Sequence, residues 1–343
     1  MLQPDDYLHA AKVLADANAP AEPRILRFLA FLGLPENASG SEAALLRFAG
    51  RLDRVFAIRL PDAPGATLFG ATHALRADLS YAGATDGTVP GSYAGVGLTP
   101  LAAFARCIGE AAEYAAMYAL TDDTRTVDAR LLRRLDNPGL ARSSTGYAAG
   151  SSLKMATDAA IRERVERHAI ALWYAGGGAA LLHAPHAAQW LEAAYRAGTQ
   201  TRAGAQYLML PHKVAGLSVV ASITRGETGI AVGYGCAPDT TQAACKALTE
   251  VLQGEFALGL ERGRTEQGIQ PPPTGFLARS ALFAARSDLF EATLPAVVAT
   301  GAPPRARITD LTVPGTDIPV VHARIDGLTD IAALIAPGCV GPV

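Results

Sequence analysis

Residues 99–113 read TPLAAFARCIGEAAE, an apolar helical pattern that carries two glutamates one turn apart. Thr99 followed by Pro100 is a typical helix start, because a capping side chain precedes a proline in the first helical position. Glu110 and Glu113 then share one helix face. Two like charges on an apolar helix repel each other, and they do so more strongly once they leave water. The stretch therefore predicts a cationic partner at this face.

Two further helix starts repeat the arrangement. Ser152 and Asp239 each follow a glycine-bearing turn and each can cap a helix, as Thr99 does. Counting eleven and fourteen residues from the three caps gives Glu110 and Glu113, Glu163 and Glu166, and Glu250 and Gln253. Each pair lies roughly 16 Å into its helix. The matched offsets predict that the three pairs converge on one site.

Five carboxylates and one amide are hard oxygen ligands, the kind that Mg²⁺ prefers. Magnesium that has few protein ligands commonly binds together with nucleotide phosphates, so the pattern favours a magnesium nucleotide. Two alternatives remain open. The charged stretch RERVERH at 162–168 is typical of a solvated helix face. Arg106, one turn before Glu110, could form a simple salt bridge with it.

Composition excludes several classes of protein. The chain has 343 residues, 50% of them apolar and 18% charged, which is enough to bury a large core. A net charge of −2 and a pI near 6.4 supply no basic field for nucleic acid. Four cysteines without a CxxC pair, and an N-terminus without a secretory pattern, favour a cytoplasmic protein. No apolar run is long enough to predict a membrane span.

The coarse pattern predicts an α/β or α+β fold in which strands alternate with alanine-rich helices. Helices are expected over 5–17 and 23–34, and strands over 55–61, 205–214, 217–225, 229–235 and 318–325. A loop rich in glycine, threonine and serine is expected between the first strand and residue 97. These elements suggest an N-terminal region over 1–70 and a core over 71–343. PPPTG at 271–275 reads as a connector, after which 271–343 could form a C-terminal lobe.

Four blocks of sequence resemble one known family. AGVGLT leads into RCIGEAAEYA, TGYAAGSS leads into ERVERHAIALWY, a glycine turn leads into KALTEVLQGE, and PVVHARIDGLTD comes late in the chain. In this order they resemble the YcaO superfamily of ATP-dependent amide-activating enzymes, over roughly residues 85 to 330. The resemblance implies a YcaO-like fold with mixed or antiparallel sheets and three helices converging on a nucleotide site.

The resemblance also implies roles for individual residues. In that family the paired carboxylates coordinate Mg²⁺ around the phosphates of ATP. The metal role passes to Glu110, Glu113, Glu163, Glu166 and Glu250, and Gln253 is expected near the nucleotide. Arg167, Arg324 and His322 are the basic residues that the alignment places best for contact with phosphates.

The family reaction adds a nucleophile to a backbone amide carbon of a peptide, and ATP phosphorylates the amide oxygen, which then leaves as phosphate. The resemblance implies that this chain acts on a ribosomally synthesised precursor peptide. Azoline formation by a cyclodehydratase is the first expectation, and thioamide formation with a TfuA-type partner is the alternative. A leader-binding partner protein and a homodimer are expected on the same basis. No side chain of the enzyme need act as a nucleophile.

The sequence departs from the family pattern at several positions. Val96 replaces a lysine, Arg106 replaces a serine, and Glu255 replaces an arginine. Because the expected metal ligands are present, a divergent active enzyme is favoured over a degenerate subunit that only binds peptide or partner. An unrelated α/β enzyme remains a second alternative, and it predicts that the three helices lie far apart.

Overall fold

The computed structural model describes residues 23–52, 54–75, 89–119, 145–199, 202, 204–271, 275–291, 305–312, 315–329 and 341. The helix expected over 5–17 lies outside these residues. The next expected helix is confirmed as α2 (Pro23–Leu32), and α3 (Gly40–Ala49) follows it. Both helices pack on α4 (Pro100–Ala119), which begins at the capped stretch of residues 99–113.

The described strands form three antiparallel sheets, which confirms the predicted fold class. The first sheet has the order β1 (Arg54–Leu60), β2 (Ala63–Leu75), β3 (Val89–Gly97). The second has the order β4 (Tyr147–Ala149), β10 (Val320–Ile325), β9 (Ala306–Asp310). The third has the order β5 (Ala180–Leu182), β6 (Gln206–Met209), β7 (Ser218–Gly226), β8 (Gly229–Ala237).

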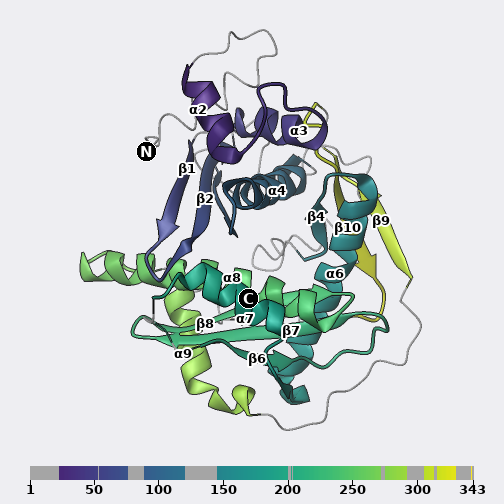
Figure 1. Cartoon of the computed structure of the whole chain (residues 1–343). Helices are drawn as coiled ribbons and strands as arrows, with labels where there is room; N and C mark the ends of the chain where they lie inside the picture. The colour runs from purple at the N-terminus through teal and green to yellow at the C-terminus, as the bar shows by residue number, and fades with distance from the viewer. Residues whose placement is uncertain are drawn as a thin grey trace.

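Each sheet carries one of the three capped helices (Figure 1). α4 packs on β2 and β3, α6 (Leu153–Leu172) packs on β4 and β10, and α8 (Thr240–Glu266) packs on β7 and β8. The predicted caps are confirmed. Thr99 Oγ1 accepts from Ala102 N at 3.2 Å, Ser152 Oγ from Met155 N at 3.2 Å, and Asp239 Oδ1 from Gln242 N at 2.8 Å.

Two of these strand and helix units share one packing arrangement. A Cβ atom placed on Gly95 of β3 would lie 2.3 Å from Ala103 O of α4. A Cβ atom placed on Gly235 of β8 would lie 2.2 Å from Ala243 O of α8. In both units the helix residue comes eight positions after the glycine, so only glycine allows the helix to lie this close to its strand.

The loop expected up to residue 97 is wrong, because β2 and β3 occupy most of that stretch as described. Glycine is unfavourable in strands in general, which is why the composition indicated a loop. Here the glycines make room for neighbouring groups. A Cβ on Gly70 would lie 2.3 Å from the ring of Phe56, and one on Gly65 would lie 2.0 Å from Ala194 O.

The remaining elements connect these units. α7 (His186–Arg196) packs on β2 and α8, and α9 (Phe276–Ala285) packs on β8 and α8. α6 ends in a π-helical turn, η2 (Trp173–Gly177), and a 3₁₀ turn, η3 (Ser287–Phe290), follows α9. The buried ring of Trp173 stacks on Phe283 with centroids 6.2 Å apart, which ties the end of α6 to α9. Over the described residues, every helix is too short or too polar to cross a membrane.

Candidate functional site

The structure brings the five predicted glutamates into one electrostatic group. The Glu113 carboxyl interacts with Glu110 on its own helix and with Glu163 on α6. The Glu250 carboxyl on α8 interacts with Glu163 and Glu166. We call these five side chains the glutamate cluster.

Backbone amides hold three members of the glutamate cluster in place. In each case a strand of the sheet beneath or beside the helix donates one hydrogen bond to one carboxylate oxygen. The bonds run from Ala94 N to Glu110 Oε2 at 2.9 Å, from Ala149 N to Glu113 Oε1 at 2.7 Å, and from Tyr234 N to Glu250 Oε2 at 3.2 Å. The Ala94 and Tyr234 bonds are equivalent in the two repeated units, since each spans sixteen residues.

Removal from water raises the pKa of these three carboxyls. The pKa of Glu110 rises to about 7, and those of Glu113 and Glu250 rise to about 8. Repulsion by neighbouring carboxylates adds to the effect, from Glu163 on Glu113 and from Glu166 on Glu250. Glu113 and Glu250 therefore stay largely protonated near neutral pH, Glu110 is about half protonated, and all three would release protons to a bound cation.

Two cations of the chain lie within the glutamate cluster. Arg167 Nε lies 2.7 Å from Glu163 Oε1, and Lys246 Nζ lies 3.1 Å from Glu166 Oε2. Glu166 is only 1% exposed, whereas the Lys246 side chain is 46% exposed, so Lys246 reaches the buried carboxylate from the solvent side. Removal from water lowers the pKa of each cation, but attraction by the carboxylates outweighs it and raises both pKa values overall.

The donor set fits magnesium with a nucleotide better than a bare metal ion. Five carboxylates supply oxygen ligands, and protonated buried carboxyls mark a place where positive charge is stabilising. Within the described ranges, however, no three side chains of His, Cys, Asp or Glu are grouped closely enough to hold one metal ion by themselves. Such a dispersed set suits an ion that keeps water and phosphate oxygens among its ligands, as Mg²⁺ does.

Two alternative interpretations of the glutamates, a simple salt bridge to Arg106 and a solvated helix face, are wrong. Arg106 donates from Nη1 to Val96 O at 2.6 Å, while Glu110 accepts from a backbone amide. The charged face at 162–168 is not solvated, because Glu163 is 18% exposed and Glu166 1%. The electrostatic coupling between α4, α6 and α8 also excludes an arrangement with the three helices far apart.

The other predicted phosphate contacts lie elsewhere in the structure. Arg324 on β10 is half exposed, with Nε 3.7 Å from Asp326 Oδ1. His322 stacks on Tyr147 with ring centroids 4.6 Å apart, and removal from water, together with nearby arginines, lowers its pKa to about 4. No contact described in the structure links Arg324 or His322 to the glutamate cluster. Gln253 lies half-buried on α8, one turn after Glu250.

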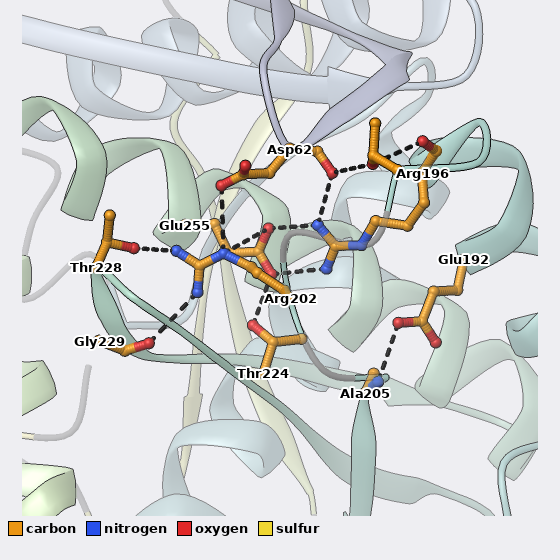
Figure 2. A network of polar contacts seen from close by, with 10 residues as sticks. Asp62, Glu192, Arg196, Arg202, Ala205, Thr224, Thr228, Gly229 and Glu255 are labelled. Atoms are coloured by element: carbon orange, nitrogen blue, oxygen red, sulfur yellow. Dashed lines mark hydrogen bonds and ion pairs between the residues drawn. The ribbon is translucent and has the colours of Figure 1, made fainter.

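Glu255, which stands where the resemblance would have an arginine, belongs to a buried ion network (Figure 2). It accepts two hydrogen bonds from Arg196 at 2.7 and 2.8 Å and one from Thr224 at 2.6 Å. Arg202 lies 3.5 Å from it and also pairs with Asp62. Five residues along a helix correspond to about 140° of rotation, so Glu255 and Glu250 face different neighbours. The network joins α7, α8, β7 and the turn after β1.

Sequence reasoning missed two cations near the glutamate cluster. Lys246 could have been found, because it stands seven residues after the cap Asp239, as Arg106 stands seven after Thr99. Arg279 of α9 gave no such signal. It interacts electrostatically with Glu250 although almost thirty residues separate them.

Comparison with protein families decides the identity of the fold. A family model described as YcaO cyclodehydratase, ATP- and Mg²⁺-binding, matches residues 116–329. The chain belongs to the YcaO family. The match includes α6 and α8 and begins just after Glu113, so the first glutamate pair lies outside it. The predicted family is confirmed, and ATP and Mg²⁺ are the cofactors of this YcaO family.

Solved structures of YcaO proteins share the fold. YcaO from Methanopyrus kandleri, bound with AMPPCP and Mg²⁺, aligns with a TM-score of 0.58 at 19% identity, over 88% of this chain and 94% of that chain. A heterocyclase in complex with substrate and cofactor aligns with a TM-score of 0.55 at 16% identity, over 85% of this chain and 52% of that chain. A search of curated proteins finds no match.

Proposed function

We propose that this YcaO protein uses ATP and Mg²⁺ to activate a backbone amide in a ribosomally synthesised precursor peptide, giving an azoline heterocycle. The observation that carries the proposal is the glutamate cluster, in which three carboxyls have pKa values near 7 or 8 and two cations lie beside the others. The fold match to a YcaO bound with AMPPCP and Mg²⁺ supports it.

Residue roles follow from position. The glutamate cluster would hold Mg²⁺, with Gln253 near the nucleotide. Mg-ATP, when bound, supplies the phosphoryl group that turns the amide oxygen into a leaving group. Arg167 and Lys246 carry positive charge beside the cluster and would stabilise the phosphates. Substrate binding and orientation are then the main tasks of the chain.

The buried thiols support a mechanism without an enzyme nucleophile. Removal from water raises the pKa of Cys107 far above its ordinary value and that of Cys236 to about 12. A thiol with a raised pKa is a poor nucleophile because little thiolate is present. The attacking group would therefore come from the peptide, or from a sulfur donor in the thioamide alternative.

A precursor peptide and a leader-binding partner protein are the expected partners. The fold match to a heterocyclase in complex with substrate and cofactor supports an azoline product. Thioamide formation with a TfuA-type partner is the second candidate, and a catalytically degenerate scaffold is the third. We further propose a cytoplasmic homodimer with a core over 71–343.

Isothermal titration calorimetry with Mg-ATP tests the nucleotide site. The wild type should bind, and Glu110→Gln combined with Glu163→Gln should abolish binding, while Glu266→Gln, an exposed change on α8, should leave it unchanged. Absence of binding by the wild type would refute the proposal. A degenerate scaffold that still binds would release no phosphate when a peptide is added.

Mass spectrometry of a peptide rich in Cys, Ser and Thr separates the two products. Incubation with ATP and the protein should remove the mass of one water for each azoline. Replacement of oxygen by sulfur in the presence of a sulfide source would instead support the thioamide alternative. The ratio of phosphate released to water lost should be one, because one phosphoryl transfer activates one amide.

A further inference from the structure

Arg279 on α9 is a partly buried cation without a polar partner among the described residues. Its Nε–H group is buried and donates no hydrogen bond to the described residues. The guanidinium instead lies over the ring of Phe276, 5.0 Å from the centroid. Arginine stays charged at all physiological pH values, so it cannot relieve this situation by losing its proton. A buried polar group left without a partner is unusual in native proteins and calls for a ligand or another explanation.

Glu261 of α8, the carboxylate that attracts Arg279 most, already has other hydrogen-bond partners. Glu261 accepts hydrogen bonds from Phe276 N at 3.0 Å and Leu277 N at 2.8 Å, which satisfies amides at the start of α9. Its attraction for Arg279 therefore acts without a hydrogen bond between the two side chains in the described structure. The Arg279 Nε–H donor is therefore left for another group.

The packing of α9 against β8 and α8 places Arg279 near the site. Ser280, the next residue, accepts a hydrogen bond from Ile230 N of β8 at 2.8 Å. Phe276, one turn earlier, faces Gly254 of α8, where a Cβ would lie 3.9 Å from its ring. The largest electrostatic interaction of Arg279 is with Tyr234 of β8, and weaker ones reach Arg167 and Glu250, so Arg279 lies near the α8 side of the glutamate cluster.

Arg279 also differs from the two other cations near the glutamate cluster. Arg167 and Lys246 each form an ion pair with a carboxylate, so contact with a phosphate must compete with that pair. Arg279 has no such pair to break in the described structure. Its planar fork of donors matches the oxygens of a phosphate group.

We infer that Arg279 is a nucleotide-binding residue that donates to the phosphates of the magnesium nucleotide at the glutamate cluster. The inference rests on the proposed function. It assigns a contact to a helix that follows the three capped helices, so that α9 closes the site beside α8. The ligand chemistry is that of a nucleoside triphosphate, and the contact is made to phosphate oxygens rather than to the base.

Two variants and one control test the inference. Arg279→Met keeps the aliphatic stem over Phe276 and removes the charge, and Arg279→Lys keeps the charge without the fork. The control Arg286→Met removes a partly exposed arginine just after the same helix. We expect Arg279→Met to weaken Mg-ATP binding by about 10- to 100-fold, the loss of charge-assisted hydrogen bonds. Arg279→Lys should retain part of the affinity, and Arg286→Met all of it.

A second readout separates nucleotide binding from a structural role. If Arg279 lacks a partner without nucleotide, the melting temperature of nucleotide-free Arg279→Met should equal or exceed that of the wild type. Unchanged Mg-ATP affinity in Arg279→Met, or a lower melting temperature without nucleotide, would overturn the inference. A wild type that binds no Mg-ATP would instead overturn the proposed function, and this inference with it.

Discussion

Replacing Glu113 by glutamine should make the nucleotide-free protein more stable and unable to bind Mg-ATP well. In the folded chain the Glu113 carboxyl has a pKa of about 8, raised by removal from water and held at one oxygen by Ala149 N. Glutamine has the same shape, carries no charge and can accept the same hydrogen bond. The substitution thus mimics the protonated form permanently.

The magnitude follows from proton linkage. An unfolded glutamate has its ordinary pKa near 4.5, so it ionises at pH 7 while the folded group stays largely protonated. Each pKa unit corresponds to about 1.36 kcal/mol, so the unfolded state gains about 3 kcal/mol at pH 7 and less than about 1 kcal/mol at pH 5. Glutamine removes this gain. Stability of the wild type should therefore fall as pH rises from about 4.5 to 8, because the folded state binds more protons.

Thermal unfolding without nucleotide at pH 5, 7 and 8 measures the effect, and calorimetry with Mg-ATP follows binding. We expect Glu113→Gln to unfold several degrees above the wild type at pH 8 and at nearly the same temperature at pH 5. Glu266→Gln, whose side chain is 67% exposed, should show no such dependence. A lower melting temperature for Glu113→Gln at pH 8 would refute the idea that this carboxyl is held protonated.

Three further changes have distinct signatures. The affinity for Mg-ATP should rise between pH 6 and pH 9 as Glu113 and Glu250 give up protons, which calorimetry in buffers of different ionisation enthalpy detects as proton release. Lys246→Met removes the partner of the buried Glu166 carboxylate and should lower the free energy of unfolding by about 1–2 kcal/mol. The effect is no larger because about half of the lysine side chain is exposed to solvent. Urea denaturation measures the change, and an unchanged midpoint would contradict the pairing. Glu255→Ala leaves buried Arg196 and Arg202 without their shared carboxylate and should cost about 3–5 kcal/mol in the same assay while the affinity of the folded protein for Mg-ATP stays unchanged.

The sequence predicted the parts of the site that depend on local geometry. Helix caps at Thr99, Ser152 and Asp239 define where each helix begins, and a fixed count from a cap defines a depth and a face. Both quantities are independent of the surrounding fold. For this reason the convergence of the glutamate cluster could be inferred before the sheets were known.

Contacts between distant elements could not be predicted in this way. The stretch that forms β2 and β3 was expected to be a loop because it is rich in glycine. The reason for Gly70 is its close packing against Phe56, which lies on another strand and could not be predicted from the local sequence. Glu255 read as a lost phosphate contact, whereas Arg196 and Thr224 make it part of a buried network. No sequence motif indicated Arg279 as a residue of the site, since its place near Glu250 depends on how α9 packs against α8 and β8.

The energetics of the glutamate cluster favour a chain that binds a cationic ligand over a degenerate scaffold that binds none. The departures from the family pattern have packing roles here: Val96 is buried at 1% exposure, Arg106 binds its carbonyl, and Glu255 is neutralised by arginines. The glutamates do not stabilise the fold in this way, because raised pKa values such as those of Glu113 and Glu250 lower the free energy of unfolding of the nucleotide-free chain at neutral pH. A scaffold without a cationic ligand would become more stable by exchanging them for neutral residues. Three such carboxyls in one place are best explained by a ligand whose binding free energy offsets their cost.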